Sequence, residues 1–223
     1  MKNLNYKVLL FTGIIGLLAS ILVGIGEFLL HFDPLARFSE TSYDFMLAAT
    51  DQRQTLGHFF GSLGAPLYVV GSVHIYLMLK PANKTLAFMG LIIGAYGFII
   101  GGQWISSRAS IGAITHLQQT GMELDSLVQF YQLRYEKLLT IIRITTLITS
   151  LIFIILTLTG RSHYQRWHAL FSPIVLLLFS FLVYVISPNI GKYLMPIALN
   201  VGFGLFFLIS LIQVKKQMPV KNR

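Results

Sequence analysis

The sequence contains six apolar runs, and each is long enough to cross a bilayer as a helix. The hydrocarbon core is about 30 Å thick and takes about 20 helical residues to span. The chain has 223 residues and only 11% of them are charged, whereas soluble domains carry about 25%. We therefore predict an all-α, polytopic membrane protein that forms one membrane domain, residues 1–223. The predicted helices cover approximately residues 8–30, 55–79, 85–107, 138–160, 168–188 and 193–214.

The distribution of charge predicts the orientation. Ten of the 17 Lys and Arg residues lie near the two termini or in the short connections 80–84 and 161–167. Because cytoplasmic loops carry an excess of Lys and Arg, we predict a six-helix bundle with both termini cytoplasmic. The segments 31–54 and 108–137 are then external. The basic face attracts anionic membrane lipids, and since no nucleic-acid-binding motif accompanies it, we expect no nucleic-acid partner.

A stripe of small residues on the first run continues into two ionisable residues. On a helix that turns about 100° per residue, the stripe comprises Gly13, Gly16, Ser20, Gly24, Glu27 and His31. Small residues let membrane helices approach closely, so the stripe is predicted to face the bundle interior. An ionisable residue within a membrane is costly and is typical of a functional site.

The other predicted helices repeat this pattern. All six carry polar or amphipathic groups within a few residues of their external ends, so these groups share one layer. We predict that this layer forms an externally facing pocket for a small or lipid-like ligand, with Glu27 and His58 as candidate catalytic or acid–base groups. Arg143 would bind an anionic group or pair with Glu27. The predicted ligand-binding residues are Glu27, His58, Gln103, Trp104, Arg143, Tyr184 and Asn200.

The same layer has a purely structural interpretation. Trp and Tyr favour membrane interfaces, and the long side chain of Arg143 can extend outward to water. A pair between Glu27 and Arg143 could also serve only to fix the register of two helices. The sequence leaves both interpretations open.

A zinc site is a further alternative. Glu27 and His31 are spaced i,i+4, and His58 approaches from a neighbouring helix, so the three side chains could hold zinc with a fourth position open. Asp33 and His116 are candidates for extra ligands. The spacing matches no paired-histidine zinc motif, and we therefore predict no cofactor. The absence of cysteine excludes disulfide and thiolate chemistry.

The third run has a glycine face, formed by Gly90, Gly94, Gly97 and Gly101, that continues into Trp104 and Arg108. Two GxxxG spacings on one face predict a closely packed helix. Packing within the chain is the preferred interpretation. The alternative is oligomerisation, in which this face contacts another chain.

Three phrases carry a resemblance to a known group: GIGEFLLHFDP, GHFFGSLGAPLYVVGSVHIYLMLKP and GAYGFIIGGQW. They resemble uncharacterised bacterial six-helix integral membrane proteins of the domain-of-unknown-function type. The resemblance implies a multi-pass protein of the bacterial plasma (inner) membrane. It brings no known activity and no site residues.

Four functions remain open from the sequence. The first is a membrane protein that binds a small or lipid-like ligand in the external pocket. The second is a membrane-embedded hydrolase or isomerase that acts on a lipid, so whether the chain is an enzyme stays undecided. The third is a proton-coupled transporter of small solutes in which Glu27 titrates. The fourth is a structural or partner-binding membrane subunit.

Overall fold

The computed structural model describes residues 5–37 and 43–218, which are helical throughout apart from their connections and contain no strand. The all-α class is therefore confirmed for these residues. We use η for 3-10 helices. The elements in chain order are α1 (Tyr6–His31), η1 (Asp44–Ala48), α2 (Asp51–Leu79), α3 (Lys84–Gln118), α4 (Asp125–Leu158), η2 (Arg166–Phe171), α5 (Pro173–Ile186), α6 (Pro188–Leu194), η3 (Met195–Ile197) and α7 (Ala198–Gln217).

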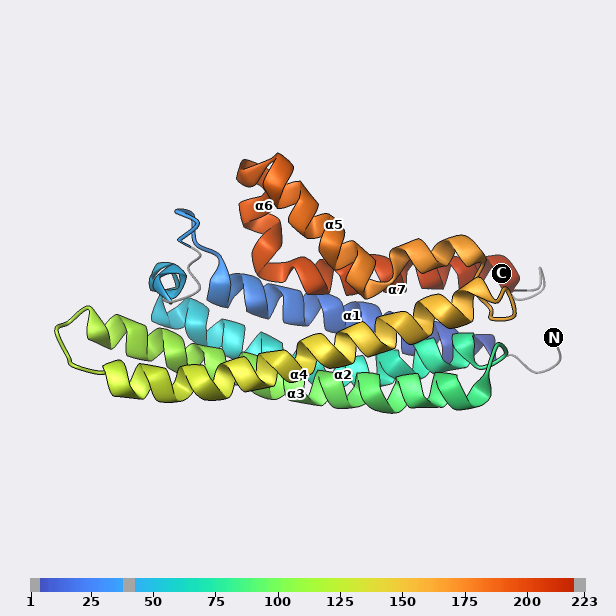
Figure 1. Ribbon diagram of the computed structural model, residues 1–223, viewed down its shortest axis with the longest axis horizontal. Coiled ribbons are helices and arrows are strands. Elements are labelled where there is room, and N and C mark those ends of the chain that lie inside the picture. The colour runs from blue at the N-terminus through green and yellow to red at the C-terminus, as the bar shows by residue number, and fades with distance from the viewer. Residues whose placement is uncertain (1–4, 38–42, 219–223) are drawn as a thin grey trace.

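Within the part of the chain that the structure describes, five helical segments are long and apolar enough to cross a membrane: α1, α2, α3, α4 and the segment Pro188–Gln217. Their outward faces carry large apolar side chains; Phe11 and Leu63, for example, are 62% and 70% exposed. Such a surface suits lipid rather than water. Figure 1 shows the long helices side by side in an elongated bundle, with the start of α1 and the end of α7 at the same end. We name this the inner end, and the opposite end the outer end.

The fifth predicted run does not form one long helix. Instead of a helix over 168–188, η2 ends at Phe171 and α5 extends over only 14 residues from Pro173, which is about 21 Å. Proline lacks an N–H donor and is favoured at the first position of a helix, so the helix restarts there. The described residues therefore contain five long spans and one short apolar helix, rather than six equal spans. In Figure 1, α5 leans away from α4.

Other boundaries also differ from the prediction. The last run, expected over 193–214, begins earlier as α6 and is interrupted at η3, which contains Pro196. The third and fourth helices are longer than predicted, because α3 continues to Gln118 and α4 already begins at Asp125. These extensions form a helical hairpin over much of the segment 108–137, which the charge pattern marked as external.

The small-residue stripe of α1 faces the bundle interior, as predicted, since Gly13, Gly16, Ser20, Gly24 and His31 are all buried. The adjacent α1–α2 contact is closer still. A Cβ atom on Gly26 would lie 2.6 Å from the backbone nitrogen of Gly61. Only glycine allows two helices to approach so closely.

The glycine face of α3 turns toward α4 and toward an internal cavity described below. A Cβ atom on Gly97 would overlap Thr145 of α4, and one on Gly90 would lie 3.3 Å from Ile152. In contrast, a Cβ atom on Gly101 would have no neighbour within 4 Å. The face therefore packs closely against α4 at Gly97 and leaves open space at Gly101.

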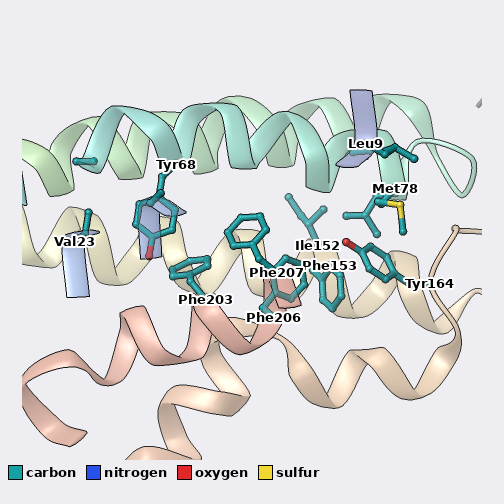
Figure 2. Packing of buried hydrophobic residues seen from close by; sticks show 14 of the residues in the cluster. Leu9, Val23, Tyr68, Met78, Ile152, Phe153, Tyr164, Phe203, Phe206 and Phe207 are labelled. Carbon is teal, nitrogen blue, oxygen red and sulfur yellow. The ribbon is translucent and has the colours of Figure 1, made fainter. Parts of the chain in front are cut away.

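Aromatic rings of α7 fill the centre of the bundle. Figure 2 shows Phe203, Phe206 and Phe207 in a row between Tyr68 of α2 and Tyr164, which precedes η2. The ring centroids of Tyr68 and Phe203 lie 5.3 Å apart, within the range of favourable aromatic pairs. This row separates a polar network at the inner end from the candidate site at the outer end.

The inner network fixes α7 to α1 and α2. His74 is fully buried; its Nδ1 lies 3.0 Å from the carbonyl oxygen of Leu9, and its Nε2 lies 2.6 Å from the hydroxyl of Ser210. The Ser210 hydroxyl is in turn 2.8 Å from that of Tyr164. Buried polar groups that are satisfied in this way specify one packing arrangement.

Candidate functional site

A cavity of about 640 Å³ lies among α1–α5 and α7. It extends from Leu79 near the inner end to Glu27 and Arg108 near the outer end. Over that length α3 contributes residues from Gly90 to Arg108, and 18 helical steps correspond to about 27 Å. The volume is within the range of about 300–1,000 Å³ that is usual for small-molecule sites.

The chemistry of the cavity changes along its length. The inner part is lined mainly by apolar side chains such as Ile75, Leu79 and Phe206, and the hydroxyl of Ser72 there donates to the Tyr68 carbonyl oxygen. The charged lining residues Glu27, Arg108 and Arg143 lie in the outer part together with His31 and Tyr184, while the ring of Tyr68 stacks on Phe98 about midway along the cavity. The cavity is therefore amphipathic.

Two lining residues mark where the cavity reaches the surface of the bundle. Arg143 of α4 and Phe181 of α5 are exposed, whereas the other residues that line the cavity are buried or half-buried. These two helices diverge toward the outer end in Figure 1. The mouth of the cavity thus lies between α4 and α5.

Glu27 is held by a hydrogen-bonded chain that crosses three helices. The Asn200 side-chain amide on α7 donates to Glu27 Oε2 at 2.5 Å, and the Tyr68 hydroxyl on α2 donates to Asn200 Oδ1 at 2.7 Å. Asn200 and Tyr68 are both more than 90% buried. Each end of the Asn200 amide is therefore satisfied, and the Glu27 carboxyl is fixed on the cavity wall.

Arg108 lies in an aromatic cage beside Glu27 and is only 6% exposed. Its guanidinium carbon is 4.0 Å from the ring centroid of Tyr135 and 5.2 Å from those of Trp104 and Phe45. The ring of Tyr43 lies 5.6 Å away. Aromatic faces attract a cation within about 6 Å, so the cage stabilises the charge without neutralising it.

His31 fixes the guanidinium from the α1 side. Arg108 Nε donates to His31 Nε2 at 2.7 Å. An imidazole nitrogen that accepts a hydrogen bond carries no proton, so His31 is neutral and has its proton on Nδ1. The backbone of Pro196 in η3 is hydrogen-bonded to the same imidazole. His31 thereby orients Arg108 and adds no positive charge of its own.

The turn after α1 positions the cage residues of η1. Asp33 is fully buried and accepts hydrogen bonds from Arg37 Nε at 2.7 Å and from the backbone N–H of Leu35. Burial alone would raise the pKa of Asp33, but these hydrogen bonds outweigh it and lower the pKa below 3.8. Arg53 of α2 donates to the carbonyl oxygens of Phe32 at 3.0 Å and Ala48 at 2.7 Å. The end of α1, η1 and the start of α2 are thus joined, and Phe45 is held against Arg108.

The structure brings together five of the seven ligand-binding residues that the sequence predicts. Glu27 and Asn200 touch each other, and the cavity is also lined by Trp104, Arg143 and Tyr184. The Glu27–Arg143 pair does not form: among the described residues, the Arg37–Asp33 contact is the ion pair within 4 Å, and Arg143 is exposed.

His58 and Gln103 lie away from Glu27, so the expected Glu27–His58 centre is not assembled. His58 Nδ1 is 3.2 Å from the carbonyl oxygen of Ser106 on α3, and His58 does not line the cavity. Gln103 lines a separate surface groove of about 590 Å³ between α2 and α3. Both residues are at the expected depth, but they occupy the other face of their helices.

The zinc candidates are also separated. His31 Nε2 is occupied by Arg108, His58 faces Ser106, and no group of three His, Cys, Asp or Glu residues in the described part of the chain could hold a metal ion. The two extra candidates have other contacts: Asp33 binds Arg37, and His116 Nε2 lies 3.3 Å from the carbonyl oxygen of Met46.

Sequence reasoning missed Arg108 and Tyr68 as site residues. The sequence prediction placed Arg108 at the start of an external segment. Arg108 nevertheless shares one helical face with Gly101 and Trp104. This shared face indicated that α3 continues as a helix to Arg108 and that the side chain of Arg108 faces the bundle interior. Tyr68 carries no comparable signal, because tyrosine is common at many positions of membrane helices. Its role follows only from the position of Asn200 on α7.

Comparison with known proteins identifies a family of unknown function. A family model described as "Family of unknown function (DUF6796)" matches residues 1–217. This agrees with the resemblance to an uncharacterised domain noted in the sequence. No curated protein and no solved structure matches the chain.

Proposed function

The chain belongs to the DUF6796 family, and we propose that it binds one lipid-like amphiphile in its internal cavity. The apolar tail occupies the inner part of the cavity, and the polar head lies at the outer end. The observation that carries the proposal is the segregation of chemistry along one continuous cavity, whose charged lining residues Glu27, Arg108 and Arg143 all lie in its outer part. A small polar solute would make no favourable contacts with the long apolar part of the cavity.

The dimensions support a single chain as the tail. The cavity follows about 27 Å of α3, and its inner walls are buried apolar residues such as Leu79 and Phe153. Lipid tails in a bilayer are already as apolar as these walls, so moving a tail into the cavity changes the free energy little. Selection among membrane lipids must therefore come from the head and from the outer end of the cavity.

The ligand reaches the cavity from the bilayer, between α4 and α5. Arg143 and Phe181 are the exposed lining residues, and they lie on these two helices. An aliphatic tail can pass Phe181 from the lipid phase, while the head passes the Arg143 guanidinium. No polar group of the ligand then has to cross the centre of the bilayer.

We further propose that the protein crosses the bacterial plasma membrane six times, with both termini in the cytoplasm. In this topology α5 is the short fifth crossing, and α6 and α7 together form the sixth crossing, which ends in the cytoplasm. The support is the concentration of basic residues at the inner end, such as Lys80, Arg161 and Lys215, together with the positive-inside rule and the resemblance to bacterial membrane proteins.

The topology has a direct test, because the chain has no native cysteine. A single cysteine at Gly121, in the α3–α4 turn, should react with a membrane-impermeant maleimide on intact cells. A cysteine at Ser162, in the α4–η2 connection, should react only after permeabilisation. The reverse labelling pattern would show that the orientation is inverted.

The test of ligand binding uses the two tryptophans. Trp104 lines the cavity, whereas Trp167 lies in η2 at the inner end and is 45% exposed. A single-chain amphiphile brominated on the tail carbons next to its head should quench Trp104 fluorescence saturably in the Trp167→Phe protein, because Trp104 lies at the outer end of the cavity with the head. The matched Trp104→Phe protein should show only the non-saturable quenching that surrounding detergent or lipid produces. Identical quenching curves for the two proteins would refute binding in the cavity.

A further inference from the structure

We infer that the head of the bound amphiphile is an anion, a carboxylate or a phosphate, and that Arg108 binds it. This inference rests on the proposed function, because it names the chemistry of the head at the outer end of the same cavity. It assigns a role to Arg108, which the sequence places on the glycine face of the third run but not among the predicted ligand-binding residues.

The first argument is that Arg108 is a buried charge without a countercharge. It is only 6% exposed, and it has no carboxylate within 4 Å among the described residues. A buried charge without a partner is strongly unfavourable in proteins. The aromatic cage offsets part of this cost, and an anion against the guanidinium would offset the remainder.

The second argument concerns hydrogen-bond donors. A guanidinium has five N–H donors, and the structure shows one of them in use, from Nε to His31. Arg108 also lines the cavity, so the side chain is accessible from the space in which the head would lie. Two oxygens of a carboxylate or phosphate accept two parallel N–H groups from one guanidinium, whereas the single oxygen of a neutral hydroxyl cannot form this pair.

The third argument is that neighbouring donors also lack acceptors. Trp104 Nε1 and the Tyr43 hydroxyl are buried, and neither has a hydrogen-bond partner within the described residues. Burial raises the pKa of Tyr43 above 10.0, so its hydroxyl keeps its proton and remains a donor. Donors without acceptors therefore gather around Arg108, and an oxygen-rich anion is the group that would complement them.

The acidic residue that lines the cavity, Glu27, does not already fill that role. Glu27 accepts from Asn200 at 2.5 Å and is not paired with Arg108. The charged residues that line the cavity are two guanidinium groups, Arg108 and Arg143, against the single carboxyl of Glu27. This balance favours one additional negative charge. The exposed Arg143 at the mouth would attract the same anion on its path inward.

The experiment compares three ligands of equal brominated chain length: a fatty acid, a lysophosphatidic acid and a neutral monoacylglycerol. Binding is read from Trp104 quenching in the Trp167→Phe protein. We expect the two anionic ligands to bind at least about tenfold more tightly than the neutral one, because hydrogen bonds between charged groups are stronger than hydrogen bonds to a neutral hydroxyl. The Arg108→Gln substitution should remove this preference by weakening the binding of the two anionic ligands.

Two controls accompany that variant. Arg134 lies on the exposed surface of α4 with its guanidinium carbon 3.8 Å from the ring centroid of Phe130, outside the cavity, so Arg134→Gln should keep the full preference. If Arg108→Gln does not elute as folded protein on size exclusion, Arg108→Lys replaces it. Lysine retains the charge but lacks the planar fork, so the anionic preference should fall without being abolished.

The outcomes separate the two proposals. If the protein with Arg108 unchanged binds anionic and neutral ligands with equal affinity, the proposal of an anionic head is wrong, while saturable quenching still supports the binding of an amphiphile. No saturable quenching by any ligand overturns the proposed function itself. Competition by acetate or inorganic phosphate at the concentration of the amphiphile would show that the site takes a free anion instead of a lipid headgroup.

Discussion

The closest approach of α1 and α2 gives a sharp test of the packing that supports the site. We expect Gly26→Ala to destabilise the protein, because the added Cβ atom would lie 2.6 Å from the backbone nitrogen of Gly61 and 2.8 Å from the carbonyl oxygen of Gly57. Backbone atoms cannot rotate away as a side chain can. The two helices must therefore separate, and Glu27 is the next residue along α1.

The magnitude follows from the cost of overpacking a close-packed interior, which is about 1–3 kcal/mol for an added carbon. For a chain of this length, each kcal/mol shifts the melting temperature by about 2–4 °C. Gly101 is the matched control, since a Cβ atom there would meet nothing within 4 Å. Alanine is favoured over glycine in a helix by about 0.5–1 kcal/mol, so Gly101→Ala should raise the melting temperature slightly.

The assay is thermal unfolding of both variants and the parent protein in the same detergent, followed by the loss of monodisperse protein on size exclusion. We expect a melting temperature about 2–12 °C lower for Gly26→Ala and an unchanged or higher one for Gly101→Ala. If Gly101→Ala were the more damaging substitution, the assigned contacts of α1, α2 and α3 would be wrong.

Three further substitutions test the polar contacts. Asn200→Leu should lower the free energy of unfolding, measured by chemical unfolding, by about 1–3 kcal/mol for each polar group left without a partner. Adding Tyr68→Phe removes one of these groups and should recover part of the loss. No recovery would contradict the hydrogen-bonded chain from Tyr68 through Asn200 to Glu27. Asp33→Asn should lower the melting temperature at neutral pH. The lowered pKa of Asp33 stabilises the fold above pH 3.8, and this contribution is lost as the pH falls through the pKa that Asp33 has in the folded protein. If the difference in melting temperature from the parent protein did not shrink as the pH is lowered, the stabilising role of the ionised carboxylate would be wrong. His74→Leu should cost about 1–2 kcal/mol in the same unfolding measurement, since the Ser210 hydroxyl keeps its contact with Tyr164.

The helical class and the inward face of α1 could be predicted because they depend on local periodicity. An apolar run of sufficient length forms a helix in lipid irrespective of its partners. A stripe of small residues that includes Gly16 and Ser20 can be read by counting turns. The same reasoning failed for residues 168–188, where the apolar character is continuous but Pro173 starts a new helix. Hydropathy does not register this break, since proline changes backbone geometry and hydrogen bonding rather than polarity.

The composition of the site could be predicted only in part, because it depends on how helices rotate against one another. Asn200 and Glu27 were expected at one depth, and they meet because both also face inward. His58 was expected at the same depth, but the α1–α2 contact is made by Gly57 and Gly61, which turns the imidazole toward Ser106. Depth follows from position in the sequence. The direction of a side chain around its helix follows from contacts between residues that are far apart in the chain.

The two arginines of the cavity separate the structural and the ligand-binding interpretations of the outer polar layer. Arg143 is exposed, so an interfacial arginine that extends toward water explains it without any ligand. Arg108 does not fit that explanation, because it is buried beneath four aromatic rings and donates to the neutral His31. A structural ion pair would place a carboxylate beside it, and Glu27 instead binds Asn200. Arg108 is buried and oriented, and no carboxylate of residues 5–37 and 43–218 lies within 4 Å of it. A receptor for an anionic head requires such a cation, and for this reason the substitution of Arg108 is more informative than the substitution of any acidic residue.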